Sequence, residues 1–512
     1  IYLVRSFLLI FIYLLVFQLK AQTFKVFADG NLIKVHEQND VTLTHGLSSF
    51  KLARITYREK PIKIKVESSI LSENGNEWSI SPKRYKIKSE KSGNELYFRI
   101  DRLGYVVLRL KQNQDFTKRL VLLFEAPEVV PDKSINIVDI YGVDNSGKKN
   151  ETSKIQRALD DISGSKNVLY FPPGLYKSYK LEFRSNSRIH LNKNARIIAD
   201  DNSISSYISN DKTKINHFIL IKDVQNLHIS GLGTLDGNGT QIVGLSHSEQ
   251  SLKIGGIRLL LIYRSSNIQI EGIILKDAAR WNTHILNSKH ISFRYCKLMN
   301  NPVENKYLGS LDGWDPDSSS DILIENSFGW AGDDTVAIKC TGRGENQDKI
   351  PNVERITVRN NVFLTKKSAL KIGTETYCER MQNIIFENND IIESDRVMGI
   401  NVRDGALVNE VLFKNVHAEY CHPDRKQNGI NFYITKRNED SSLGKIQKIT
   451  IEDCTFKVAF PKKWAFYRHF SQTQKNDLSV HLKNVFVEGK KIDRMDSEFF
   501  DPQKNNAELT FE

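Results

Sequence analysis

The sequence predicts an all-β protein, a right-handed parallel β-helix preceded by a small N-terminal β-sandwich. A short motif, apolar–any–apolar followed by a polar residue, recurs through the C-terminal two-thirds of the 512 residues. From residue 268 onward its instances are 23 to 38 residues apart, with loops of varying length. Such short alternating strands suit stacked coils of one repeated type. The instances are Leu227-His228-Ile229, Ile268-Gln269-Ile270, Ile291-Ser292-Phe293, Ile322-Leu323-Ile324, Ile356-Thr357-Val358, Ile384-Ile385-Phe386, Val411-Leu412-Phe413, Ile449-Thr450-Ile451 and Val480-His481-Leu482.

The first 21 residues have the pattern of a signal peptide. Arg5 precedes an apolar run over 7–17 that is short for a membrane span, and Ala21 suits cleavage. A membrane anchor is the alternative interpretation of the same run. We therefore expect a secreted or periplasmic protein with no membrane attachment after cleavage.

Residues 23–128 are expected to form the sandwich. Alternating runs, separated by turns such as 91–94, predict half-buried antiparallel strands. Pro127 and Pro131 mark the boundary, because proline cannot donate a hydrogen bond to a strand ladder. The module is interpreted as structural, with carbohydrate binding as the alternative. The expected strands cover 62–66, 85–87, 96–100, 105–110 and 120–124.

The β-helix is expected over 132–490. A helix over 153–162 places Ile155, Leu159 and Ile162 on one face and would cover the open N-terminal end of the coils. Residues 168–176 follow as the first coil, and 491–512 are expected to be a C-terminal tail. Four asparagines after successive strands are expected to bond one another in an inward ladder: Asn326, Asn360, Asn388 and Asn415.

Composition excludes several classes of function. The five cysteines have no CxxC spacing or regular histidine partners, so neither a metal site nor a cofactor is predicted. The net charge of +12 is compatible with an anionic polysaccharide, although scattered surface lysines give the same value. No segment resembles a nucleic-acid-binding module. We expect a monomer whose partner is a polysaccharide.

Three aspartates carry the expected chemistry. Asp312 lies 21 residues before the pair Asp333-Asp334, so about one coil would bring the two segments side by side. Hydrolysis of a glycosidic bond needs a protonated carboxyl group for the leaving oxygen and an ionised carboxylate for the attacking water. Asp315 and Asp317 are interpreted as turn residues instead. A calcium-binding pair is the alternative interpretation of Asp333-Asp334.

These segments resemble glycoside hydrolase family 28, the polygalacturonase family, within the pectate-lyase-like β-helix group. The resemblance covers roughly 136–490 and is most specific over 332–339, where Gly-Asp-Asp-x-x-Ala-Ile-Lys is matched through Lys339. It is also carried by 231–237, by the Trp281-Asn282-Thr283-His284 segment and by 310–315. The resemblance implies an inverting hydrolase with Asp312, Asp333 and Asp334 as the catalytic carboxylates. Among them we expect Asp334 to be the acid.

Two departures from that family bear on the substrate. The family's Gly-His-Gly turn would fall near 367–375, where there is no histidine, and its Arg-Ile-Lys motif aligns with Asn401-Val402-Arg403. We therefore expect poor recognition of galacturonate. The layout is also similar to glycoside hydrolase family 49, the dextranases and isopullulanases, which leaves galactans, sulfated glycans and dextran-like glucans open. The expected substrate-binding residues are Arg403, Asn401, Lys371, Glu375, His284, Trp281 and Lys339.

Several of these residues have a structural alternative. His284 is equally well explained as a hydrogen-bonded structural residue, and Trp281 as packing at the wall of a cleft. Two other classes of function also remain open at the level of sequence. One is a polysaccharide lyase on the same fold, and the other is a non-catalytic glycan-binding solenoid, which would have no need for three crowded carboxylates.

Overall fold

The protein is described by a computed structural model in which the chain divides into two compact units, Ile1–Pro127 and Glu128–Glu512. The predicted signal peptide over 1–21 lies outside the described residues. Within the described part of the chain, no helix has the length and apolarity needed to cross a bilayer. The structure describes residues 24–37, 50–72, 77–112, 115–203, 207, 215–246, 256–300, 310–344, 349–421, 428–457, 462–469, 474–495 and 498–512.

The first unit contains two five-stranded sheets that share one apolar core. Residues that alternate along the strands, such as Ile64, Val66, Leu108 and Leu122, are buried between the sheets. One sheet has the order β2-β1-β5-β8-β7 and the other β3-β4-β10-β9-β6. The strands are β1 (Lys25–Ala28), β2 (Asn31–Ile33), β3 (Val35–Glu37), β4 (Phe50–Thr56), β5 (Ile62–Glu67), β6 (Glu77–Ser81), β7 (Ser89–Ser92), β8 (Glu95–Ile100), β9 (Gly104–Gln112) and β10 (Asp115–Glu125), with a short 3-10 helix η1 (Ser69–Ser72).

Two expectations for this unit are wrong in detail. The sandwich is not purely antiparallel, because β10 pairs in parallel with β4. The strand expected over 85–87 is absent, and the 3-10 helix η2 (Lys83–Tyr85) ends there at Lys86 in the left-handed region. Pro82 precedes that helix and has no N–H to donate to a neighbouring strand. The residues around Ile87 therefore do not pair as a strand, although their apolar and polar side chains alternate.

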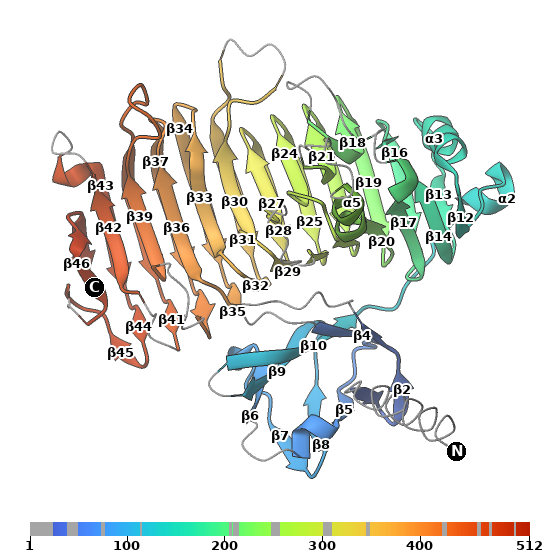
Figure 1. Ribbon diagram of the computed structural model, residues 1–512, viewed down its shortest axis with the longest axis horizontal. Coiled ribbons are helices and arrows are strands. Elements are labelled where there is room, and N and C mark those ends of the chain that lie inside the picture. Colours follow the sequence, from blue (N-terminus) through green and yellow to red (C-terminus); the bar gives the residue numbers. More distant parts are fainter. Residues whose placement is uncertain are drawn as a thin grey trace, which may run out of the picture. The chain divides into compact units, whose positions relative to one another are not determined.

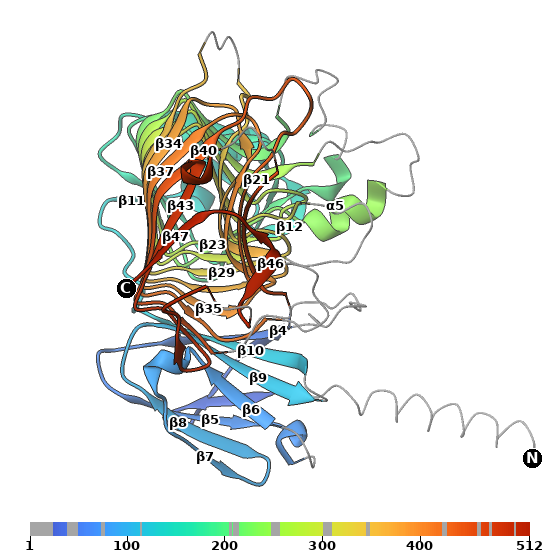
Figure 2. The ribbon, with the colours of Figure 1, turned by 90° about the vertical axis from the view of Figure 1, so that its left-hand side faces the viewer.

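The second unit is a right-handed parallel β-helix built from three long sheets (Figure 1). Figure 2 looks along the stack of coils, where strands of successive coils lie over one another. The first sheet contains β11 (Ser134–Asn136), β13 (Val168–Phe171), β16 (Ser187–Leu191), β19 (Gln225–Gly231), β22 (Ser266–Glu271), β25 (Lys289–Arg294), β28 (Ser320–Glu325), β31 (Val353–Arg359), β34 (Arg380–Glu387), β37 (Leu407–Lys414), β40 (Lys445–Glu452), β43 (Leu478–Lys483) and β47 (Glu508–Phe511).

The second and third sheets complete each coil. The second sheet contains β12 (Ser146–Asn150), β14 (Gly174–Ser178), β17 (Ala195–Ala199), β20 (Thr234–Asp236), β23 (Ile274–Lys276), β26 (Lys297–Met299), β29 (Phe328–Ala331), β32 (Val362–Thr365), β35 (Asp390–Glu393), β38 (His417–Ala418), β41 (Thr455–Phe456), β44 (Phe486–Val487) and β45 (Lys490–Lys491). The third contains β15 (Leu181–Glu182), β18 (His217–Lys222), β21 (Arg258–Tyr263), β24 (Thr283–Leu286), β27 (Trp314–Asp317), β30 (Val336–Cys340), β33 (Ser368–Thr376), β36 (Arg396–Val402), β39 (Ile430–Ile434), β42 (Trp464–Arg468) and β46 (Phe500–Asn505).

The repeated apolar motif forms the first sheet, as the sequence predicts. Its first apolar positions stand in register from coil to coil, for example Ile291 beside Ile322 and Ile356 beside Ile384. These side chains are buried in one continuous core that runs the length of the stack. Burial of a side chain of this size stabilises the fold by about 1.5–3 kcal/mol. The period of the repeat therefore reports the coil length directly.

The expected asparagine ladder is confirmed in part. Asn326, Asn360, Asn388 and Asn415 all adopt positive φ, and they turn the chain from the first sheet to the second. Asn415 Nδ2 donates to Asn388 Oδ1 at 2.5 Å, but these two side chains are only partly buried. An inward pair is formed by the residues that follow, where Asn361 Nδ2 donates to Asn389 Oδ1 at 3.0 Å and both side chains are fully buried. A residue in the left-handed region reverses the side of the chain, so the following side chain faces the core.

The two ends of the stack are closed differently. At the N-terminal end lie α2 (Ile137–Tyr141) and α3 (Thr152–Asp161), and α3 buries Ile155, Ala158 and Leu159 against the first coils (Figure 1). Residues 491–512, expected to be a tail, contain β46 and β47, which pair with β42 and β43. Phe500 and Ala507 are buried there, so the last coil is covered by this segment. The remaining helical elements are α5 (Gly239–Ser246), η3 (Asp201–Ser203) and η4 (Lys475–Asp477).

All five cysteines are buried in the second unit, and none of them forms a disulfide bond. Cys296 and Cys454 follow strands of the first sheet and occupy apolar positions, as expected from the sequence. Burial raises the pKa of both thiols to about 12, so neither is a nucleophile at neutral pH. No group of three or more His, Cys, Asp or Glu side chains suited to a metal ion occurs among the residues that the structure describes.

Candidate active site

The three aspartates lie at one edge of the third sheet, where the chain enters neighbouring strands. Asp312 precedes β27 and Asp334 precedes β30, and the pairing of Trp314 with Val336 brings the two segments side by side. The backbone fixes this arrangement, because Gly313 N donates to Asp334 O at 2.8 Å and Asp333 N to Leu311 O at 3.2 Å. One coil of the stack therefore joins the two acidic motifs.

Asp334 is held as an anion. Its Oδ2 lies 2.5 Å from Lys371 Nζ, and its Oδ1 accepts a bond from Ser368 N at 2.9 Å. Burial works against the charged form, but the Lys371 ammonium outweighs burial and holds the pKa of Asp334 at about 2. Arg396 adds to this field and donates to Ser368 Oγ at 3.1 Å. Neither Ser368 nor Arg396 was marked as functional by any sequence pattern.

Asp333 has the opposite character. Its side chain is only partly accessible to solvent, and burial together with the charges of Asp312 and Asp334 raises its pKa to about 7. Its backbone carbonyl accepts a bond from Thr365 Oγ1, which fixes the turn before β30. Two adjacent aspartates are thus biased toward different protonation states.

Lys339 organises the other side of the site. Its Nζ lies 2.5 Å from Asp312 Oδ2, 2.8 Å from Asp315 Oδ1 and 3.6 Å from the centre of the Trp281 ring. Burial lowers the pKa of Lys339, but the charges of Asp312 and Asp315 raise it above its usual range. Lys339 is almost fully buried, so it positions Asp312 from the interior of the protein.

Asp315 and Asp317 are not turn residues. Both lie in β27. Side chains alternate along a strand, so Trp314 and Pro316 face the core and the two carboxylates face the other side of the sheet, where they are also fully buried. Burial raises the pKa of Asp315 well above its usual value. The two aspartates were expected in a turn because aspartate side chains often bond the nearby backbone there.

His284 supports the site from within. It is fully buried, its Nε2 lies 2.9 Å from Asp317 Oδ2, and burial lowers its pKa to about 4. Asp317 also accepts bonds from Thr341 N at 2.8 Å and Thr341 Oγ1 at 2.6 Å. Burial works against the Asp317 charge, yet these bonds lower its pKa. His284 is thus a buried side chain that contacts Asp317.

The remaining expected residues lie on the later strands of the third sheet. Lys371 and Glu375 belong to β33, Asn401 to β36, and Arg403 follows β36. Asn401 is buried and donates to Asn431 O at 3.3 Å. Arg403 is half-buried, its backbone N donates to Thr376 Oγ1 at 3.0 Å, and its Nε has no described partner.

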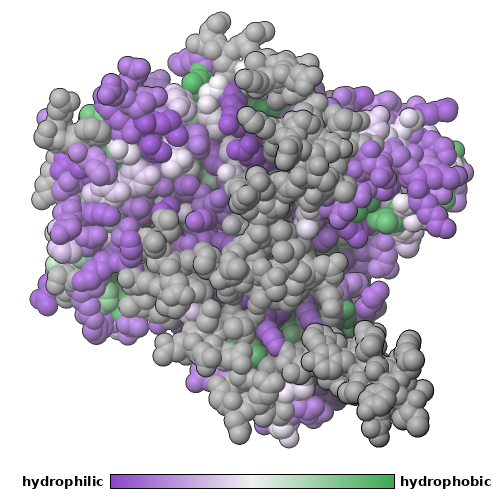
Figure 3. Space-filling model, viewed as in Figure 1, coloured by the Kyte–Doolittle hydropathy of each residue, from purple (hydrophilic) through white to green (hydrophobic). Residues whose placement is uncertain are grey.

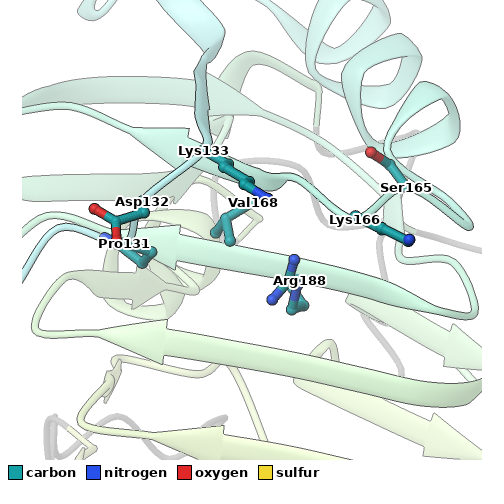
Figure 4. Close-up of a pocket in the computed structure, with 7 residues that line it drawn as sticks. All are labelled: Pro131, Asp132, Lys133, Ser165, Lys166, Val168 and Arg188. Atoms are coloured by element: carbon teal, nitrogen blue, oxygen red, sulfur yellow. The ribbon is translucent and has the colours of Figure 1, made fainter.

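The described surface of the face seen in Figure 3 is mostly hydrophilic, with small, scattered apolar patches. A separate hollow of about 690 Å³ lies near the start of the stack (Figure 4). Asp132 is the one acid among its described lining residues, so it offers no acid–base pair. Its lining is Pro131, Asp132, Lys133, Ser165, Lys166, Val168 and Arg188.

Comparisons with known proteins show the family and the fold. The sequence model described as "Glycosyl hydrolases family 28" matches residues 175–493. A "Probable polygalacturonase" of Vitis vinifera is 27% identical over 222 residues, 40% of this chain and 44% of that protein. An "Endo-polygalacturonase" of Pectobacterium carotovorum subsp. carotovorum is 27% identical over 293 residues, 52% of this chain and 68% of that protein. The chain thus spans less than half the length of the first of these relatives.

Solved structures share the fold. The Yersinia enterocolitica family 28 exopolygalacturonase has a TM-score of 0.58 at 14% identity, covering 89% of this chain and 97% of that one. Dex49A from Penicillium minioluteum has a TM-score of 0.60 at 12% identity, covering 96% of this chain and 94% of that one. At these identities the likeness concerns the fold alone.

Proposed function

The chain belongs to glycosyl hydrolases family 28, and on that basis we propose that it is a secreted, inverting hydrolase of a plant or algal polysaccharide. The signal-peptide pattern over 1–21 supports export. In this proposal the enzyme acts as a monomer and uses no metal or cofactor. The carboxylates alone supply the acid and the base.

The observation that carries the proposal is the opposite bias of Asp333 and Asp334. A glycosidase needs one carboxyl group that keeps its proton and one that does not. A pKa of about 7 suits Asp333 to the acid, whereas a pKa of about 2 keeps Asp334 ionised. This reverses the role expected for Asp334 from the sequence, because the Lys371 ammonium, and not proximity to other acids, dominates its environment.

The reaction then follows in one displacement. Asp333 donates its proton to the glycosidic oxygen as the bond to the anomeric carbon breaks. A water held by Asp312 and Asp334 attacks that carbon from the opposite face and gives up its proton to this pair, which inverts the configuration. Lys339 orients Asp312, and Lys371 orients Asp334 and keeps it ionised.

The substrate-binding roles divide between contact and support. Arg403 and Glu375 are the candidates for contact with sugar hydroxyls or acidic groups, since both are partly accessible on the later strands. A guanidinium binds such groups through two parallel hydrogen bonds. Trp281, Asn401 and His284 are buried and are assigned to shaping or supporting the site.

The test is a screen of the purified protein against polygalacturonate, dextran, galactans and sulfated algal glycans, with sizing of the products. We expect new reducing ends. Their anomeric configuration, measured by NMR in the first minutes of the reaction, should be opposite to that of the cleaved bond. Asp312→Asn, Asp333→Asn and Asp334→Asn should each lower kcat by at least about 10²-fold while the fold is kept. Unsaturated uronate products would indicate a lyase instead, and turnover close to that of the wild type in all three variants would end the proposal.

A further inference from the structure

Four cationic side chains gather beside the carboxylates, on the side of β21 and β24. Around the ring of Trp281 lie Lys339 Nζ at 3.6 Å, Arg258 Cζ at 4.9 Å and Arg343 Cζ at 5.4 Å. Arg280 immediately precedes Trp281 in the chain. Cations are attracted to an aromatic face, but this gain is small against the mutual repulsion of several like charges held close together.

Two of these guanidinium groups have few partners. Arg258 is 4% exposed, and its Nη1 donates to Gly256 O at 3.0 Å, while its Nε has no hydrogen-bond partner. The buried Nε of Arg280 also has none. Burial and the nearby charges of Arg343 and Arg280 lower the pKa of Arg258 to about 9. Burial and the cationic neighbours thus outweigh the attraction that Asp315 and Asp317 exert on Arg258 through space.

The nearby acids do not supply that counter-charge directly. Asp312 and Asp315 are bound by Lys339, and Asp317 by His284 and Thr341. Asp312 and Glu375 attract Arg280 through space. Among the described residues, however, no carboxylate lies within ion-pair distance of Arg258 or Arg280. A negative group entering beside Trp281 would therefore gain charge-assisted hydrogen bonds at little expense to existing pairs.

We propose that Arg258, Arg280 and Arg343 form an anion-binding subsite beside Trp281 that takes one carboxylate or sulfate ester of the polysaccharide. This inference rests on the proposed function. It adds to that function the place where a charged group of the substrate binds. It lies on the opposite side of the catalytic aspartates from Arg403. Trp281 and Arg403 are four strands apart, which is about 19 Å along the stack at a strand spacing of about 4.8 Å. Trp281 precedes β24, whereas Arg403 follows β36, so the two residues also lie at opposite ends of their strands.

The direct test measures binding in the catalytically inactive Asp333→Asn background by calorimetry. The probes are a galacturonate oligomer for the carboxylate, a sulfated galactan oligomer for the sulfate, and a dextran oligomer as the neutral ligand. We expect Arg280→Gln and Arg258→Gln each to weaken binding of one anionic oligomer at least tenfold, and to make that binding less sensitive to salt. Arg355→Gln, which removes an equally charged surface residue paired with Asp321 on the first sheet, should change nothing. Equal losses for the dextran oligomer would overturn the subsite.

A second measurement, of the melting temperature, needs neither the polysaccharide nor a substitution of the buried Arg258. Inorganic sulfate should raise the melting temperature of the wild type more than sodium chloride does at equal ionic strength, because it binds the folded state. The double variant Arg280→Gln/Arg343→Gln should lose this difference, and Arg355→Gln should keep it. Absence of the difference in the wild type, together with no arginine-dependent binding of either anionic oligomer, would overturn the subsite. Cleavage of a neutral glycan that is abolished by Asp333→Asn would still support the proposed function in that case.

Discussion

Lys371 Nζ lies 2.5 Å from Asp334 Oδ2, so the two adjacent aspartates of the site experience different electrostatic environments. Asp334 is compensated by a buried ammonium, whereas Asp333 receives the repulsion of Asp312 and Asp334. The ordering of the two pKa values depends on this one ion pair. Lys371 is therefore expected to control catalysis without touching the reacting atoms.

Removal of that ammonium tests the dependence. Lys371→Met should raise the pKa of Asp334 and lower kcat at least about tenfold, with a shift of the acidic limb of the pH–rate profile toward higher pH. Lys448→Met removes an exposed lysine paired with Glu410 and should leave the profile as it is. A variant with lower kcat but an unchanged profile would show that Lys371 acts only through structure.

The pH dependence of the native enzyme follows from Asp333. An acid with a pKa of about 7 is protonated below that pH, so kcat/KM should decline as the pH rises through about 7 in the free enzyme. The decline should be tenfold per pH unit on the alkaline side. A profile that stays flat up to pH 9 would contradict the assignment of Asp333 as the acid.

The carboxyl group of Asp333 also affects the free energy of unfolding. In the unfolded chain an aspartate ionises near 3.8, whereas folded Asp333 holds its proton to about 7, so the folded state loses stability as the pH rises between these values. Above pH 7 the loss amounts to about 4 kcal/mol. Asp333→Asn should therefore be more stable than the wild type at pH 8, and this difference should vanish near pH 4. Asp440→Asn, at an exposed position, is the control in thermal or denaturant unfolding at each pH.

The sequence predicted the fold and the proximity of the acidic motifs because both depend on the coil period. The apolar motif repeats once per coil, and Asp333 follows Asp312 by 21 positions, about one coil, so their proximity is a matter of register. Asp315 and Asp317 were interpreted as turn residues because aspartate is common in turns, whereas both lie in the strand β27. Local signals were outweighed there by the stacking of neighbouring strands.

The electrostatics of the site could not be predicted in the same way. Lys371 lies in β33, and the two aspartates precede the neighbouring strand β30. The coil period does not specify which of the two carboxylates the Lys371 side chain contacts. The arginines around Trp281 come from three coils, at positions 258, 280 and 343, and share no sequence motif. The proposed exchange of roles between Asp333 and Asp334 depends on the contact between Lys371 and Asp334.

His284 offers a test of structural support as distinct from contact with substrate. His284→Ala would leave the buried Asp317 without one of its hydrogen-bond partners, at a cost of about 1–3 kcal/mol in the free energy of unfolding. Because the imidazole is fully buried, we expect kcat/KM to change little once the protein is folded. Denaturant unfolding and kinetics on the same preparation separate the two effects. A large rise in KM with unchanged stability would instead indicate contact with the substrate.

Arg403 is the expected point of contact on the later strands. Its side chain is half-buried beside β33 and β36, and the resemblance aligns it with a substrate-gripping lysine while Asn401 replaces the second cation. Arg403→Ala should raise KM and lower kcat/KM by about 1.5–3 kcal/mol, the range of a charge-assisted bond, whereas Arg355→Ala should not. With Asn401 in place of the second cation of the motif, the native enzyme is expected to act poorly on de-esterified pectin. Rapid hydrolysis of polygalacturonate would mean that a carboxylate is recognised elsewhere, and its loss in Arg280→Gln would assign that recognition to the arginines around Trp281.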